Sequence, residues 1–150
     1  MNDTSRIKVV LMAEDDSDDR LLVKDDMAES GWQGDLRFVQ DGEELMDYLR
    51  HSGKYGELAS APRPGVILLD LNMPRKDGRE ALREIKADPG LRSIPLVVLT
   101  TSKASTDISH TYDLGANSFI VKPIQFEALV NVMRTLGQYW FDTVELPALK

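Results

Sequence analysis

The sequence contains no cysteine, so neither a disulfide framework nor thiolate chemistry is available to it. Its apolar runs all fall well short of the roughly 20 residues that span a bilayer. The opening stretch, MNDTSRIKVVLMAEDD, turns acidic too soon for a secretory signal. These absences lead us to expect a cytoplasmic protein with no membrane partner.

Acidic residues outnumber basic ones. Lys and Arg number 18 against 25 Asp and Glu, which gives a net charge of −7. Such a chain does not bind nucleic acid non-specifically, because phosphate contacts need clustered Lys and Arg. The acidic balance suits a cation or a basic partner surface.

Short apolar runs alternate five times with segments of helical spacing. The runs are 7–12, 36–39, 66–69, 96–99 and 118–121, and the helical segments are 18–30, 43–51, 79–87, 105–114 and 125–140. This alternation predicts βαβ units, and so an α/β fold with a doubly wound five-stranded parallel sheet. We expect a single domain over 1–150, with a core at about 6–137 and a C-terminal extension at 138–150.

Two segments are longer than a minimal five-stranded domain of this kind requires. Residues 51–65 are rich in Gly, Ala and Pro and form either a solvated loop or a loop that contacts a partner. The last helical segment has an apolar arc of roughly 200°, wider than a surface helix needs. Either the tail folds back over the surplus or a second protein covers it, and we favour the second. The candidate interface residues are Phe126, Val132, Leu136, Tyr139, Trp140 and Phe141.

Polar side chains gather where the predicted strands end, which is where open parallel sheets bind ligands. They are Glu14, Asp15 and Asp16 after the first strand, Asp70 and Asn72 after the third, Thr100 at the fourth and Lys122 after the fifth. Crowded carboxylates repel one another unless a cation lies among them. Oxygen ligands without a His or Cys cluster favour Mg²⁺ over zinc.

A carboxylate beside a divalent ion, a lysine and a hydroxyl is what phosphoryl transfer to aspartate requires. Asp70 is the candidate acceptor, because the end of a buried strand holds a nucleophile more rigidly than a loop does. Met73-Pro74 forces an extended bend after it, and Asp77-Gly78 is a turn pair that leads into the next helix.

Four motifs, VVLMAEDD, VILLDLNMPRKDG, IPLVVLTTS and GANSFIVKP, resemble in order and spacing the receiver domain of two-component response regulators. The resemblance covers about 7–136. It implies a flavodoxin-like (βα)5 fold, in which Asp70 accepts phosphate from a phosphohistidine on a sensor histidine kinase. It also implies that the protein catalyses only its own phosphorylation and dephosphorylation, and so is not an enzyme in the metabolic sense.

The same resemblance implies roles for the other site residues. Asp15 would contact Mg²⁺ directly and Glu14 through water, and the backbone carbonyl of Asn72 would complete the metal site. The remaining roles are Lys122 on the phosphoryl oxygens, Pro123 after a cis peptide bond, and Thr100 and Phe119 as moving switch residues. Asp15 and Asp16 are an alternative acidic pair, although Ala13 favours Glu14 and Asp15. Phe119 is equally well explained as a core residue.

The long loop and the tail are similar to those of stand-alone regulators that serve phytochrome histidine kinases, some of which pair through the last helix. We therefore expect a phytochrome-type kinase as partner, a homodimer and no output domain. Two alternatives stay open. One is a receiver-fold binding module that works without phosphate. The other is an aspartyl-phosphate phosphohydrolase, which is disfavoured because Asn72 stands where such enzymes place a second acid.

Overall fold

A computed structural model describes residues 8–29, 34–57 and 61–147. In this part of the chain, strands and α-helices alternate as the hydrophobic pattern predicts. The strands are β1 (Val9–Ala13), β2 (Asp35–Val39), β3 (Val66–Leu69), β4 (Leu96–Thr100) and β5 (Ser118–Val121). The helices are α1 (Ser17–Glu29), α2 (Gly42–Arg50), α3 (Gly78–Ala87), α4 (Ser105–Leu114) and α5 (Phe126–Gly137). None of the described helices is long and apolar enough to cross a membrane.

The strands form one parallel sheet in the order β2-β1-β3-β4-β5. The chain moves outward from β1 to β2 and then crosses back to β3 on the other side of β1. The strand order therefore reverses between β1 and β3, and open α/β sheets bind ligands beyond the carboxyl ends at such a point. Because Ala13 pairs with Leu69, the residues that follow β1 and β3 leave the sheet side by side.

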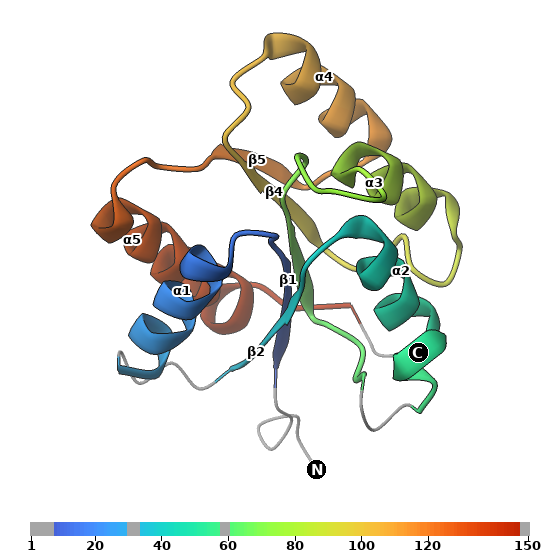
Figure 1. Ribbon diagram of the computed structural model, residues 1–150, viewed down its shortest axis with the longest axis horizontal. Helices are drawn as coiled ribbons and strands as arrows, with labels where there is room; N and C mark the ends of the chain where they lie inside the picture. Colours follow the sequence, from blue (N-terminus) through green and yellow to red (C-terminus); the bar gives the residue numbers. More distant parts are fainter. Residues whose placement is uncertain (1–7, 30–33, 58–60, 148–150) are drawn as a thin grey trace.

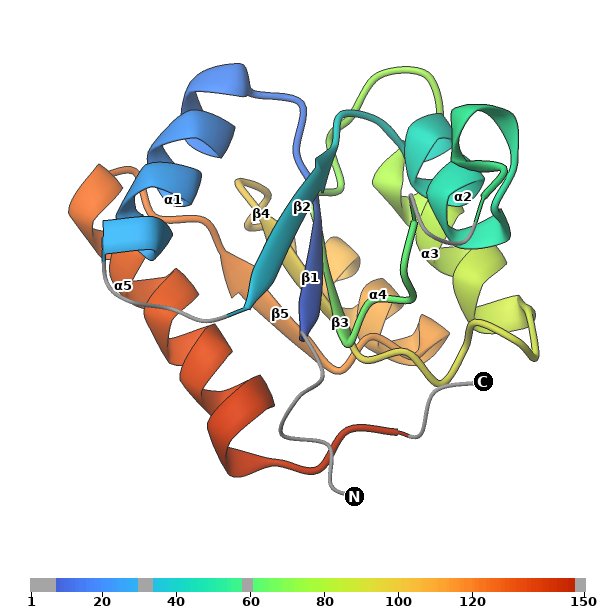
Figure 2. The ribbon, with the colours of Figure 1, turned by 90° about the horizontal axis from the view of Figure 1, so that it is seen from below.

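Helices cover both faces of the sheet. Helices α1 and α5 lie on one face and α2, α3 and α4 on the other (Figures 1 and 2). Each face encloses its own apolar cluster, and the strands β1, β3 and β4 contribute buried side chains to both. This explains why these strands consist almost entirely of apolar residues.

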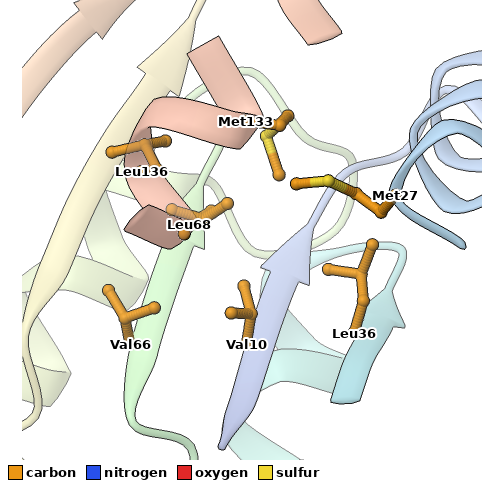
Figure 3. Close-up of a pocket in the computed structure, with 8 residues that line it drawn as sticks. Val10, Met27, Leu36, Val66, Leu68, Met133 and Leu136 are labelled. Carbon is orange, nitrogen blue, oxygen red and sulfur yellow. The ribbon is translucent and has the colours of Figure 1, made fainter. Parts of the chain in front are cut away.

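A small apolar pocket lies between the sheet and helices α1 and α5 (Figure 3). Its lining comes from β1, β2, β3 and the two helices: Val10, Met27, Leu36, Val66, Leu68, Met133, Leu136 and Gly137. The lining has no charged side chain, so the pocket belongs to the core and not to a polar site.

The long loop before β3 is held against α2. Residues Gly53–Tyr55 form a short 3₁₀ turn, η2. The Tyr48 hydroxyl donates to the carbonyl of Pro62 at 2.8 Å, and the Tyr55 hydroxyl donates to Glu44 at 2.6 Å. Residues 58–60 of the predicted loop lie outside the described residues.

The last helix differs from the prediction. Helix α5 ends at Gly137, and a π-helical turn, η4 (Gln138–Thr143), follows. Phe141, expected at an interface, is only 8% exposed because the chain folds back: its carbonyl accepts a hydrogen bond from the Lys8 ammonium, which also lies over its ring. Phe141 and Leu146 pack where a side chain at Gly65 would project. The tail thus covers part of the apolar surplus itself, and Phe141 was wrongly assigned to the interface.

Candidate functional site

Asp70 follows β3 directly and is 7% exposed. Its backbone N–H donates to the carbonyl of Ala13 at 3.1 Å, which ties the residue to β1. Its carboxylate Oδ1 accepts from the Thr100 hydroxyl at 2.8 Å and from the backbone N–H of Asn72 at 3.1 Å. Burial raises the pKa of the Asp70 carboxyl above its usual range, although both hydrogen bonds and nearby Lys122 act in the opposite direction.

Three carboxylates converge at the point where the strand order reverses. Glu14, Asp15 and Asp70 each offer an oxygen atom, and these atoms lie within 4.8 Å of one another. Glu14 is 1% exposed, whereas Asp15 is open to solvent. Asp16 points elsewhere: its carboxylate accepts from the backbone N–H groups at the start of α1, as an N-terminal cap does. Of the two acidic pairs, the structure brings Glu14 and Asp15 to Asp70.

Lys122 reaches the same cluster from the end of β5. Its ammonium donates to Glu14 and lies 3.8 Å from Asp70 Oδ2 and 3.5 Å from Asp19 Oδ2. Burial alone would lower the pKa of Lys122, but the surrounding carboxylates, Glu14 foremost, raise it above the usual value. Burial raises the pKa of Glu14, and Lys122 limits that rise.

The charge balance and the donor set fit a divalent cation. Three carboxylates against one ammonium leave two negative charges uncompensated among partly buried groups. All the donors are hard oxygen atoms, and one carboxylate is open to solvent, as suits an ion that keeps part of its water shell. Glu14, Asp15 and Asp70 are the side chains that could hold such an ion.

The structure places the other predicted residues near this cluster. Asn72 is exposed, and its side-chain amide lies 3.5 Å from the Thr100 hydroxyl. Phe119 is half-buried against the apolar cluster under α2 and α3, and its backbone N–H donates to the Tyr112 hydroxyl at 3.2 Å.

The bond before Pro123 differs from the expectation. No peptide bond among the described residues is cis, so the Lys122–Pro123 bond is trans in this structure. An X–Pro bond favours trans by only about 0.5–1 kcal/mol, so a family resemblance does not determine the isomer. Lys122 reaches Glu14 with the trans bond.

Sequence reasoning missed two features next to the site. A Cβ atom at Gly78 would lie 2.2 Å from the carbonyl oxygen of Asp70, so the first residue of α3 packs directly on the Asp70 backbone. The Asp-Gly pair indicated a turn there but not this contact. The second feature is an ion pair between Arg79 and Asp107, which are 28 residues apart; no local pattern signals such a contact.

Comparison with known proteins shows the family to which the chain belongs. The family model described as the response regulator receiver domain matches residues 10–134. This chain belongs to that family. The receiver domain is 40% identical over 141 residues to response regulator Rcp1 of Synechocystis sp., an alignment that covers 94% of each chain.

Solved structures agree with this assignment. The phosphorylated cyanobacterial phytochrome response regulator RcpA has a TM-score of 0.87 and 43% identity, with 95% of this chain and 99% of that chain covered. The Mn²⁺-bound form of Rcp1 has a TM-score of 0.85 and 40% identity, with 94% and 99% covered. A response regulator in red light signalling of R. palustris has a TM-score of 0.86 and 37% identity, with 95% and 99% covered. The receiver domain is therefore related to phytochrome response regulators and has their fold.

Proposed function

We propose that this protein is a phosphorylation-controlled regulator that accepts a phosphoryl group on Asp70 from the phosphohistidine of a phytochrome-type sensor kinase. The observation that carries the proposal is the setting of Asp70. Its carboxylate is fixed by Thr100 and Asn72, lies near a buried ammonium and is grouped with Glu14 and Asp15. Phosphorylated RcpA, 43% identical, supports the same chemistry here.

In the proposed transfer, a carboxylate oxygen of Asp70 forms a bond to phosphorus while the P–N bond to the kinase imidazole breaks. The imidazole leaves with the electron pair of that bond and takes up a proton. The acceptor must be ionised to attack, and the ammonium of Lys122 favours its ionised form. Lys122 then lies within reach of the incoming phosphoryl oxygens.

A divalent ion fits the chemistry of this site, and we propose Mg²⁺, held by Glu14, Asp15, Asp70 and the Asn72 carbonyl. When bound, the ion neutralises negative charge on the transferred group. The related Rcp1 is described in an Mn²⁺-bound form, which supports a divalent ion.

Phosphorylation of Asp70 would place charged phosphoryl oxygens beside the Thr100 hydroxyl, which donates to Asp70 Oδ1 in this structure, and charged oxygens are the stronger acceptors. We propose that Thr100 turns to the phosphoryl group and that Phe119 moves inward behind it. Phe119 is half-buried and packs at the edge of its apolar cluster, so it is placed to change position.

We propose that the protein is a single receiver domain with an extension at 138–150. We further propose that phosphorylation is communicated through α5 and the turn η4, where the protein binds a partner or pairs with a second copy of itself. Phe126 is 38% exposed and Tyr139 49% exposed, and Val132, Leu136 and Trp140 are half-buried beside them. Tyr139 and Trp140 pack edge to face with ring centroids 5.2 Å apart, and paired aromatic rings of this kind are common at protein interfaces.

The test is intact-mass spectrometry after incubation with acetyl phosphate and Mg²⁺. The proposal predicts one added phosphoryl group in the wild-type protein and none in Asp70→Asn or after EDTA. A wild-type protein that gains no phosphoryl group would overturn the proposal in favour of a phosphate-independent binding module.

A further inference from the structure

Helix α4 is weakly held by apolar packing. Among its ten residues, Ser105–Leu114, only Thr111 is buried. Its N-cap residue, Ala104, supplies no side-chain hydrogen bond to the first turn. Burial of apolar side chains normally holds a helix against a sheet, so the first turn of α4 must depend on other contacts.

One such contact is a two-pronged ion pair with α3, which lies beside α4 (Figures 1 and 2). The Arg79 guanidinium donates from Nε to Asp107 Oδ1 at 2.7 Å and from Nη2 to Asp107 Oδ2 at 2.7 Å. The Ser102 hydroxyl donates to the same Oδ2 at 2.7 Å. A planar fork of this kind fixes orientation as well as distance.

The pair is partly shielded and persistently charged. The Asp107 side chain is 18% exposed and that of Arg79 31% exposed. Hydrogen bonds from Arg79 and Ser102 hold the pKa of Asp107 at about 2, so the carboxylate stays ionised at neutral and mildly acidic pH.

Both sides of this ion pair are close in sequence to residues that contact Asp70. Arg79 follows Gly78, which packs on the carbonyl oxygen of Asp70. Ser102 stands two residues after Thr100, whose hydroxyl donates to Asp70 Oδ1. The ion pair therefore joins the segment that leaves β3 to the segment that leaves β4, directly beside the phosphorylation site.

We propose that Arg79 is a positioning residue that, through Asp107 and Ser102, holds the β4–α4 segment and the Thr100 hydroxyl in place on unphosphorylated Asp70. This inference rests on the proposed role of Asp70 as acceptor. In the proposed switch Thr100 turns from Asp70 Oδ1 to the phosphoryl group, and the contact opposes that turn. Weakening the contact therefore favours phosphorylation.

The kinetic test measures the rate of phosphorylation by acetyl phosphate and Mg²⁺ in the wild type, Arg79→Gln, Asp107→Asn and the double variant. For a partly exposed ion pair we expect each single variant to react about two- to five-fold faster, with no further gain in the double variant. The matched control is Arg83→Gln, one turn along α3, which removes the same charge and the 3.2 Å contact of Arg83 with His110. Its rate should equal that of the wild type.

A second readout does not depend on phosphate. Amide hydrogen exchange across 102–108 in metal-free protein should speed up in Arg79→Gln and Asp107→Asn but not in Arg83→Gln, with β1 and β3 unchanged. Unchanged exchange at 102–108, or a loss of protection spread over the sheet, would overturn the positioning role.

The two proposals fail in different ways. Normal wild-type phosphorylation with variant rates equal to or below that of Arg83→Gln would overturn the inference alone. A wild-type protein that takes no phosphoryl group would overturn the proposed function and, with it, the kinetic role of Arg79.

Discussion

The ammonium of Lys122 contacts Glu14, 108 residues away in the sequence, and lies farther from Asp70, at 3.8 Å from its Oδ2. Both partners of the contact are nearly buried. The lysine therefore has a structural role, neutralising a buried carboxylate, in addition to its proposed role on the phosphoryl group.

Lys122→Met keeps most of the side-chain volume and removes the charge, so the free energy of unfolding should fall by about 3 kcal/mol at pH 8 in metal-free buffer. The loss should shrink toward pH 5. Without Lys122 the folded-state pKa of Glu14 rises further above its unfolded value, and a carboxyl with a raised pKa costs stability as pH increases. Urea unfolding at both pH values measures this. The control is Lys103→Met at an exposed position, and an equal loss at both pH values would contradict the coupling between Lys122 and Glu14.

Two matched variants can decide which acidic residues bind the metal. Asp15→Asn should weaken Mg²⁺ and Mn²⁺ binding at least tenfold by titration calorimetry, because it removes a carboxylate from the cluster. Asp16→Asn should leave the affinity near that of the wild type, since Asn also caps a helix and Asp16 points to the start of α1. The reverse order of effects would assign the metal to Asp16.

The close contact between Gly78 and the Asp70 backbone can also be tested directly. In Gly78→Ala the new methyl group would meet the Asp70 carbonyl at 2.2 Å and the Leu71 Cα at 2.7 Å, both backbone atoms that cannot move aside cheaply. We expect a loss of about 2 kcal/mol or more and slower phosphorylation. At Gly56 the added atom would meet its nearest neighbour at 3.5 Å, so Gly56→Ala should leave both quantities unchanged.

The two aromatic residues of the tail should respond differently. Tyr139→Glu should shift sedimentation toward the monomer with little change in melting temperature, because Tyr139 is 49% exposed. Phe141→Ala should lower the free energy of unfolding by about 3 kcal/mol, because it empties a buried position. A Tyr139→Glu protein of unchanged mass in solution would argue against α5 and η4 as the dimer surface.

Local pattern predicted most of the fold. The ranges 66–69, 105–114 and 118–121 match β3, α4 and β5 residue for residue, because turn residues punctuate the chain around them. The prediction of one α-helix over 125–140 was wrong, because the apolar spacing continues past the end of α5 into η4, where the chain changes from α-helical to π-helical. Pattern also could not show that Phe141 is covered by its own chain.

The parallel arrangement of the strands explains which site residues could be predicted from the sequence. Glu14, Asp15, Asp70 and Lys122 all follow strands, so a parallel sheet brings them to one edge. The Arg79–Asp107 ion pair depends on how two helices sit side by side, and neither helix signals that alone.

The proposal that Asp70 itself carries the phosphoryl group can be tested directly. Borohydride reduction after treatment with acetyl phosphate and Mg²⁺ converts an aspartyl phosphate to homoserine, and peptide mass spectrometry locates that residue. If Asp70 is the acceptor, homoserine should form at position 70 alone, and none should form when Mg²⁺ is removed. Homoserine at Asp15, Asp16 or any other aspartate, with Asp70 unmodified, would contradict it.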